Sequence, residues 1–389
     1  MYGIDAEKTV NASRVREDHV LAASVFLLAG IGLVTLYSSS YAMAERFFSD
    51  GLYFFSRQAL LGAAGLLLFF IASRVRLERV RALVRPLLLG GAVLCVLTFV
   101  PGIGVTRNGA SRWIHLGSWT YQPSELVKLV LPLYLAHIFD RKQNEMESFA
   151  ASVLPPVLVT ALFFVLIYLQ NNFSTAVFIA VNALVIFFLA GVKLRYFFAA
   201  VVMLLPLSSL LILTREHRLR RLISFLWPGW EPQGAGFQVR ASLLTIGSGG
   251  FWGKGIGQGT RKIASVPEVH SDFIFSSFAE ESGFLGVLFF FAIFGIFAVL
   301  GYRAAERSES VFTRLLASGL VTVILSQALL NVAVAAGVLP ATGVPLPFFS
   351  AGGSSLATTL LVSGLIVNVA RRNRKRERRN AREEAWNAG

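Results

Sequence analysis

The chain of 389 residues has one cysteine, Cys95, and few charged side chains. A single cysteine excludes a disulfide within the chain and a cysteine metal cluster. Charged residues make up 15% of the chain and hydrophobic residues 55%, whereas a soluble domain is about a quarter charged. The composition therefore indicates a protein that crosses a membrane many times, with no room for a separate folded domain.

A spanning helix needs about 20 mostly apolar residues, and ten such runs follow one another. They cover approximately residues 19–39, 54–73, 83–100, 122–139, 149–169, 173–190, 196–213, 273–300, 311–337 and 350–370. Each is predicted to be a helix, because backbone polar groups find no partners in lipid. The predicted fold is all-α: an N-terminal segment over 1–18, a ten-helix membrane domain over 19–370 and a basic tail over 371–389.

The net charge of +14 arises mainly from bases between the apolar runs, so we expect a membrane and no nucleic acid as its partner. With ten spans, the tail and four connections rich in bases share one side. These bases include Arg74, Arg76, Arg79, Arg81, Arg85, Arg141, Lys142, Lys193, Arg195, Arg303, Arg307, Arg371, Arg372 and Arg374. The positive-inside rule then places both termini in the cytoplasm. The tail is expected to touch acidic lipid, with docking of a partner as the alternative.

Two connections on the opposite side are long, over 101–122 and about 214–271. The second is also basic, but long loops translocate largely regardless of charge. Its segment HRLRRLISFL (217–226) places apolar residues at helical spacing opposite bases. That pattern predicts a helix lying in the membrane interface.

The segment PEVHSDFIFSSFAEESGFLG (267–286) places acids at the start of the eighth span. Asp272 is expected at the outer boundary, where it either caps the helix or does chemistry. Glu280 lies about 80° and Glu281 about 180° around the helix from Asp272. At least one of these buried acids must therefore have a partner from another segment, in a functional site or a structural ion pair.

The segment RWIHLGSWTYQPSELVKL (112–129) is the second candidate. Pro123 suits a first helical turn, and Glu125 suits a helix N-terminus. Glu125 and Lys128 share a helix face and form either a structural clamp or the wall of a polar cavity. Trp113 either belongs to this candidate site or serves as an interfacial anchor.

Glycines gather in GSGGFWGKGIGQG (247–259) and PLPFFSAGGSS (345–355). They allow a backbone to approach a ligand, and Lys254 could meet a phosphate, although the P-loop pattern is absent. The outer side thus offers one acid, many bases and polar loops beside apolar helices. These features suit a ligand with a lipid tail, a phosphate and a polar head, whether it is transported, sensed or chemically changed.

Four blocks in order, GASRWIHLG…QPSELVKL, PQGAGFQVRASLLTIGSGGFWGKGIGQGT, PEVHSDFIFSSFAEESGFLG and GVPLPFFSAGGSS, are similar to those of the SEDS family (shape, elongation, division and sporulation), which includes FtsW, RodA and SpoVE. The resemblance covers essentially every span and is slightly closer to FtsW. It implies a peptidoglycan glycosyltransferase that polymerises lipid II at the outer leaflet of the bacterial plasma membrane. The family's essential aspartate then falls on Asp272, its fourth-helix pair on Glu125 and Lys128, and its loop tryptophan on Trp113.

Three positions depart from the family pattern. HSDF stands for the usual HTDF and keeps the hydroxyl, whereas Ala351 replaces an aromatic residue in FFSAGGSS. In QNNFSTA (170–176) Asn172 stands where many members have an acid, so a carboxylate role does not transfer there.

Our hypothesis is an inverting transfer in which Asp272 is the catalytic base. The expected substrate-binding residues are Trp113, Gln122, Ser124, Glu125, Lys128, Arg218, Arg221, Gln238, Arg240, Lys254, His270, Glu280 and Ser354. Cations must stabilise the leaving diphosphate of the undecaprenyl-linked donor, and a divalent cation, Mg²⁺ or Mn²⁺, is a further candidate. The resemblance implies a class B penicillin-binding protein as partner, along with other divisome or elongasome membrane proteins. The alternatives are a flippase for lipid-linked precursors and a non-catalytic divisome scaffold.

Overall fold

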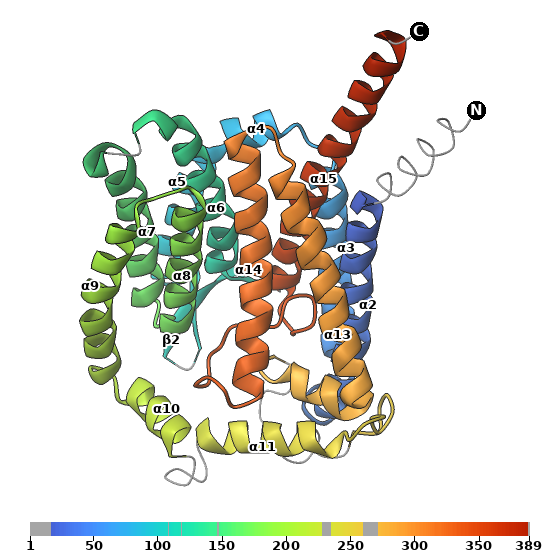
Figure 1. The fold of residues 1–389 in the computed structure, drawn as a ribbon. Coiled ribbons are helices and arrows are strands. Elements are labelled where there is room, and N and C mark those ends of the chain that lie inside the picture. Colours follow the sequence, from blue (N-terminus) through green and yellow to red (C-terminus); the bar gives the residue numbers. More distant parts are fainter. Residues whose placement is uncertain are drawn as a thin grey trace.

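The computed structural model describes residues 17–387 except 108, 118, 146–147, 228–234 and 260–270. Each of the ten predicted spans coincides with a helix (Figure 1). In chain order these are α2 (Glu17–Phe48), α3 (Tyr53–Ala72), α5 (Val84–Leu97), α6 (Pro123–Arg141), α7 (Leu154–Leu169), α8 (Phe173–Leu189), α9 (Leu194–Leu213), α13 (Ile274–Glu306), α14 (Val311–Ala335) and α15 (Gly353–Asn387). Six are long and apolar enough to cross a membrane by length and composition: α2, α3, the segment 149–169, α13, α14 and α15.

Short elements connect the spans. They are α4 (Leu77–Ala82), a 3-10 turn (Gln143–Glu145), a π-helical turn (Phe149–Val153), α10 (Glu216–Leu226) and α11 (Ala235–Ser248). The helix expected at 217–226 is therefore confirmed as α10, and α11 is a second helix in the long loop. Both lie at the same end of the bundle (Figure 1).

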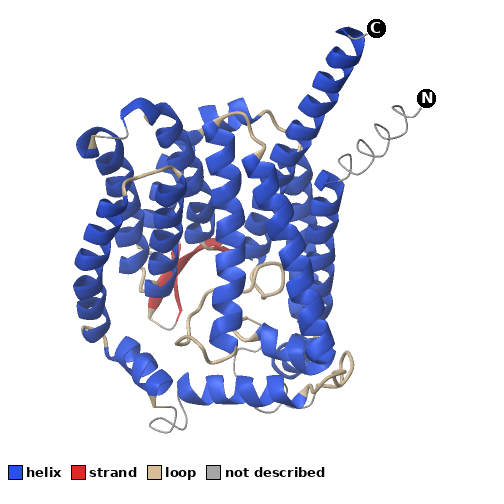
Figure 2. Cartoon of the chain, viewed as in Figure 1, coloured by secondary structure: helices blue, strands red, loops and turns tan. Residues whose placement is uncertain are grey.

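The connection over 101–122 forms a small antiparallel sheet, which the hydropathy pattern did not predict. Its strands are β1 (Gly104–Arg107), β2 (Ala110–Leu116) and β3 (Trp119–Tyr121), in that order. Ile114 of β2 aligns with Gly104 of β1 and with Tyr121 of β3. Figure 2 shows these strands at the end of the bundle nearest α10 and α11. We call this end the site end and the opposite end, where α15 terminates, the basic end.

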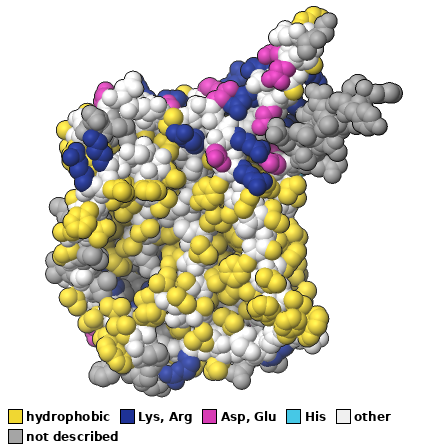
Figure 3. Space-filling view, in the orientation of Figure 1, with side chains coloured by type: hydrophobic (Ala, Val, Ile, Leu, Met, Phe, Trp, Pro, Cys, Tyr) yellow, Lys and Arg dark blue, Asp and Glu magenta, His cyan; other side chains and the backbone are white. Residues whose placement is uncertain are grey.

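Side chains follow the same division into two ends and a middle. On the face in Figure 3, hydrophobic side chains cover the middle, while Lys, Arg, Asp and Glu gather around the basic end. This pattern is typical of a bundle whose middle contacts lipid.

The basic tail is a continuation of α15, which runs as one helix from Gly353 to Asn387. Its early part is held at the basic end: Arg374 lies 2.8 Å from Asp18 of α2, and Arg376 lies 3.2 Å from Glu309. Ion pairs with neighbouring helices therefore extend the helix beyond its apolar run.

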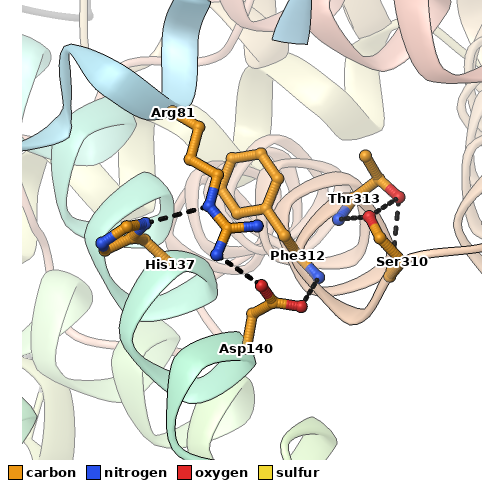
Figure 4. Close-up of polar contacts among 6 residues, drawn as sticks. All are labelled: Arg81, His137, Asp140, Ser310, Phe312 and Thr313. Carbon is orange, nitrogen blue, oxygen red and sulfur yellow. Dashed lines mark hydrogen bonds and ion pairs between the residues drawn. The ribbon is translucent and has the colours of Figure 1, made fainter. Parts of the chain in front are cut away.

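The helices α6 and α14 lie inside the bundle, with buried residues around most of their circumference. At the basic end, Asp140 of α6 accepts a hydrogen bond from the backbone N–H of Phe312 in α14 at 3.0 Å and pairs with Arg81 of α4 at 2.6 Å (Figure 4). Arg81 also donates to His137 Nδ1 at 3.2 Å. This cluster fastens three segments together at the end opposite the site.

Candidate functional site

Asp272 lies in the turn that leads into α13, and its side chain is half-buried at the site end. The N-cap position of α13 is Phe273, and it has no side-chain capping hydrogen bond. Of the two alternatives for Asp272, capping the helix or chemistry, the N-cap position therefore belongs to the residue that follows it. The turn instead presents Asp272 outside the helix, beside the loop that joins α14 to α15.

Two side chains hold the backbone on either side of this carboxylate. Asn331 Nδ2 of α14 donates to the Asp272 carbonyl at 3.0 Å and to the Val344 carbonyl at 3.0 Å. Ser350 Oγ donates to the Ser271 carbonyl at 2.6 Å. Asn331 and Ser350 thus connect the carbonyls of the consecutive residues Ser271 and Asp272 to α14 and to the 336–352 loop.

Arg112 of β2 faces the same small space as Asp272. A Cβ atom added to Gly343 would lie 3.9 Å from both Arg112 Nη1 and Asp272 Oδ2. The guanidinium also donates to the Asn171 carbonyl in the turn between α7 and α8. The pKa of Arg112 is lowered to about 10, chiefly by burial and next by the charge of Arg221, while Asp272 acts in the opposite direction.

Two arginines of α10 complete this group, which we call the arginine cluster: Arg112, Arg218 and Arg221. Arg218 is buried, with its guanidinium carbon 4.7 Å from the ring centre of Tyr168 and 4.9 Å from that of Phe173. Such stacking stabilises a cation with little water around it. Arg221 is exposed and donates to the Ala341 carbonyl at 3.4 Å. Both also lower the pKa of Arg112, which requires that they lie close to it.

Glu125 and Lys128 confirm the expectation of a shared face on α6. Lys128 Nζ lies 2.7 Å from Glu125 Oε2, and the two residues are only 5% and 2% exposed. Lys128 also donates to Gln327 Oε1 of α14 at 2.7 Å. Of the two interpretations left open for this pair, these contacts favour the structural clamp.

The spacing required a partner from another segment for at least one of Glu280 and Glu281, and both have one. Glu280 pairs with Lys254 at 2.6 Å and accepts from Ser248 Oγ at 3.2 Å. Glu281 accepts from Ser38 Oγ of α2 at 2.5 Å. The charge of Lys254 is thus paired with a carboxylate about two helical turns, roughly 12 Å, along α13 from Asp272.

A kink in α13 makes this arrangement possible. Gly283 has φ of 64°, and a Cβ there would lie 2.2 Å from the backbone nitrogen of Gly253. Only glycine permits both the left-handed backbone and the close approach. Of the glycines in 247–259, Gly249 and Gly253 pack backbone against backbone on α13.

The remaining predicted residues occupy three regions. Trp113 lies half-buried on β2 opposite Val105, and Gln122 donates to Ser124 Oγ at 2.9 Å where α6 begins. Gln238 and Arg240 lie on α11, and Ser354 lies in the first turn of α15. His270 lies outside the described residues.

No group of three or more His, Cys, Asp or Glu side chains that could hold a metal ion occurs in the part of the chain that the structure describes. Among the described residues, the charged side chains placed near Asp272 belong to the arginine cluster, and arginines do not fit as metal ligands. These residues therefore do not supply a ligand set for a divalent cation.

Three polar residues of this site were absent from the predicted set. Arg112 was part of the second candidate segment but received no role, because the sequence cannot bring β2 and α10 together. Gln327 and Asn331 were not singled out at all. Their signal was two amides four residues apart, on one face of an apolar span.

Known proteins are similar to this chain over nearly its whole length. Residues 18–375 match the family model of FtsW, RodA and SpoVE, described as "Cell cycle protein". A "Probable peptidoglycan glycosyltransferase FtsW" of Geobacter metallireducens is 37% identical over 357 residues, or 92% of this chain and 95% of the relative. "Stage V sporulation protein E" of Bacillus subtilis is 33% identical, over 94% of this chain and 100% of the relative.

Solved structures are similar over nearly the whole chain. One, from work on "structural coordination of polymerization and crosslinking by a peptidoglycan synthase complex", has a TM-score of 0.76 and 29% identity and covers 91% of this chain and 97% of the other. The rod shape determining protein RodA of Thermus thermophilus has a TM-score of 0.66 and 28% identity, with 90% and 95% covered.

Proposed function

This chain belongs to the FtsW/RodA/SpoVE family of cell cycle proteins, and from that premise we propose that it polymerises lipid II into glycan strands. It is a multi-pass membrane protein and a peptidoglycan glycosyltransferase, the activity by which its relatives are named. The observation that supports this function best is a half-buried carboxylate, Asp272, facing the arginine cluster at one end of the bundle.

Asp272 acts as the general base in this proposal. Its carboxylate accepts the proton of the 4-hydroxyl on the acceptor's N-acetylglucosamine. That oxygen attacks the anomeric carbon of the donor's N-acetylmuramic acid, the bond from this carbon to the diphosphate breaks, and the configuration inverts. A positioned base contributes about 10²–10⁴ in rate, so the carboxylate is essential for a useful turnover.

The arginine cluster binds the diphosphate that leaves. Arg112 of β2 lies far along the chain from Arg218 and Arg221 of α10, yet both arginines of α10 lower the pKa of Arg112. Gathering like charges is unfavourable for the fold alone, whereas a diphosphate satisfies all three with charge-assisted hydrogen bonds. We prefer these residues to Lys254, because Lys254 lies 2.6 Å from Glu280.

The site end faces the outer side of the bacterial plasma membrane in this proposal. Bases on short connections gather at the basic end, which the positive-inside rule assigns to the cytoplasm with both termini. The isoprenoid tails of donor and acceptor then lie in the outer leaflet. Accessibility of single introduced cysteines to a membrane-impermeant reagent tests this orientation, and the buried Cys95 adds little background.

The partner proposed is a single-span class B penicillin-binding protein that crosslinks the new strands. Support comes from the similar chain solved in a peptidoglycan synthase complex that coordinates polymerization with crosslinking. A role in division rather than elongation is favoured by relatives named FtsW at 37% identity. Localisation of a tagged copy to the septum or to the side wall tests that choice.

Dependence on Mg²⁺ or Mn²⁺ remains a prediction, to be tested by adding a chelator and then each metal. The decisive assay for the function uses purified protein, its partner and lipid II in detergent. Glycan polymer is expected there, where no bilayer remains to be crossed. A flippase would give no polymer in detergent but would move lipid II across vesicle membranes, and a scaffold would do neither.

A further inference from the structure

Helix α14 carries two amide side chains, Gln327 and Asn331, that donate to the loop joining α14 to α15. They are 2% and 1% exposed and lie four residues apart, so they share one face of the helix. Gln327 Nε2 donates to the Pro345 carbonyl at 2.8 Å. Asn331 Nδ2 donates to the carbonyls of Val344 and Asp272. The two amides therefore hold consecutive peptide groups of one loop, and one of them also holds the catalytic residue.

The chain of contacts continues from Gln327 to α6. Its Oε1 accepts from Lys128, and Lys128 pairs with Glu125. Each link is 2.7 Å long and buried from water. We call the four residues Glu125, Lys128, Gln327 and Asn331 the polar relay. It extends from the start of α6 to the carbonyl of Asp272.

The orientation of each amide in the relay is fixed by chemistry. Asn331 faces two carbonyl oxygens, so only its NH₂ group can point toward them. Gln327 faces an ammonium on one side and a carbonyl on the other, which again permits one orientation. In a buried environment, breaking any of these bonds leaves an unsatisfied polar group at a cost of about 1–3 kcal/mol. The relay therefore restrains the position of the Asp272 backbone.

We propose that Gln327 and Asn331 are positioning residues for the transfer reaction, and that Glu125 and Lys128 act through them rather than by contacting the substrate. The proposal rests on the function proposed above, in which Asp272 is the base. Lys128 is 5% exposed and is engaged by Glu125 and Gln327. Its ammonium is thus used within the protein, in contrast to the exposed Arg221 of the arginine cluster.

Two nearly isosteric substitutions remove donors from the relay. In Asn331→Asp the side chain loses both donations, and in Gln327→Glu it still accepts from Lys128 but no longer donates to Pro345. The expected result is a fall in kcat on the order of 100-fold for Asn331→Asp, since a displacement near 1 Å has effects of that size. Binding of lipid II to the same variants should stay within about twofold of wild type, because the relay makes no substrate contact.

Asn331→Ser keeps one donor and guards against a variant that fails to fold. Its kcat should fall between those of wild type and Asn331→Asp. For Lys128→Met with Gln327→Leu, the losses in kcat should be strongly non-additive, since both changes break the same chain of bonds.

Asp140→Asn is the matched control, because it weakens the contact between the same two helices at the basic end (Figure 4). It should lower the unfolding temperature and leave kcat unchanged. A kcat loss equal to that of Asn331→Asp would mean that general loosening of α6 and α14 is responsible. That outcome overturns the positioning role.

Two further outcomes overturn the proposal. Wild-type kcat in Asn331→Asp would show that the Asp272 turn needs no such restraint. A loss of lipid II binding in step with kcat would make the relay a substrate contact. Asp272→Asn measured in parallel separates this failure from that of the proposed function, because an active Asp272→Asn refutes the base whatever the relay does.

Discussion

Replacing Arg112 by methionine should affect the stability of the fold and the binding of the ligand to different degrees. The pKa of its guanidinium is lowered to about 10, well below the usual value of an arginine. Each tenfold loss of proton affinity corresponds to about 1.36 kcal/mol, so the charge costs the fold roughly 3 kcal/mol at neutral pH. The hydrogen bond to the Asn171 carbonyl offsets about 1.5–3 kcal/mol of that cost. The Arg112→Met change should therefore alter the free energy of unfolding by about 1.5 kcal/mol or less.

In this variant the free energy of ligand binding should decrease much more than the free energy of unfolding. A charge-assisted hydrogen bond contributes about 1.5–3 kcal/mol, so affinity for undecaprenyl diphosphate should fall about 10- to 150-fold. Arg81→Met is the matched control, the same exchange at the basic end, where Asp140 would lose its ion pair. It should destabilise the fold by roughly 1–3 kcal/mol and leave diphosphate binding unchanged.

The pH dependence of the same group has a definite sign. A base whose pKa is lower in the folded chain binds fewer protons when folded, so its cost applies fully below pH 10 and lessens as the pH rises toward 12.5. Diphosphate binding follows the opposite course, constant near neutral pH and lost above about pH 10. Titration of binding, with thermal unfolding in detergent, measures both effects. Unchanged affinity in Arg112→Met, with unfolding as severe as in Arg81→Met, would refute the reasoning.

Three further predictions concern the surroundings of the site. Gly283→Ala should prevent correct folding, because its φ is 64° and the new methyl would lie 2.2 Å from Gly253 N; monodisperse protein with wild-type activity contradicts this. Lys254→Met should lower the free energy of unfolding by roughly 3–5 kcal/mol, since it leaves the carboxylate of Glu280 at 0% exposure without its ion pair. Adding Glu280→Gln should restore most of that loss in thermal unfolding, and no recovery counts against the pairing. Deletion of 377–389 should leave polymerisation by purified protein unchanged, because Arg372, Arg374 and Arg376 retain their ion pairs; loss of function on deletion would favour the scaffold.

The ten spans were predictable because each is an apolar run long enough to cross lipid, and hydropathy depends only on local composition. The same property does not detect the sheet over 104–121 or the continuation of α15 to Asn387. The sheet depends on pairing between segments, and the extension of α15 on ion pairs with α2 and α4. The kink at Gly283 was also invisible, because a glycine inside an apolar helix is common in membranes.

In the site, the sequence identified Asp272, an acid where an apolar span begins. It also predicted the Glu125–Lys128 pair from their spacing, and a partner for at least one of Glu280 and Glu281 from their positions around the helix relative to Asp272. It did not choose among the cations, because Arg112 and Arg218 are joined only by the folding of β2 against α10. It assigned Lys254 to a ligand. The ion pair between Lys254 and Glu280 forms only when their two segments fold together, so the sequence did not reveal it.

The role of Asp272 as the base is decided by the rate of a single turnover in Asp272→Asn, using lipid II bound to the purified protein and its partner. The rate of bond formation should fall by about 10²–10⁴, while the affinity for lipid II is retained because the arginine cluster is intact. A single-turnover rate close to that of the wild type would contradict it.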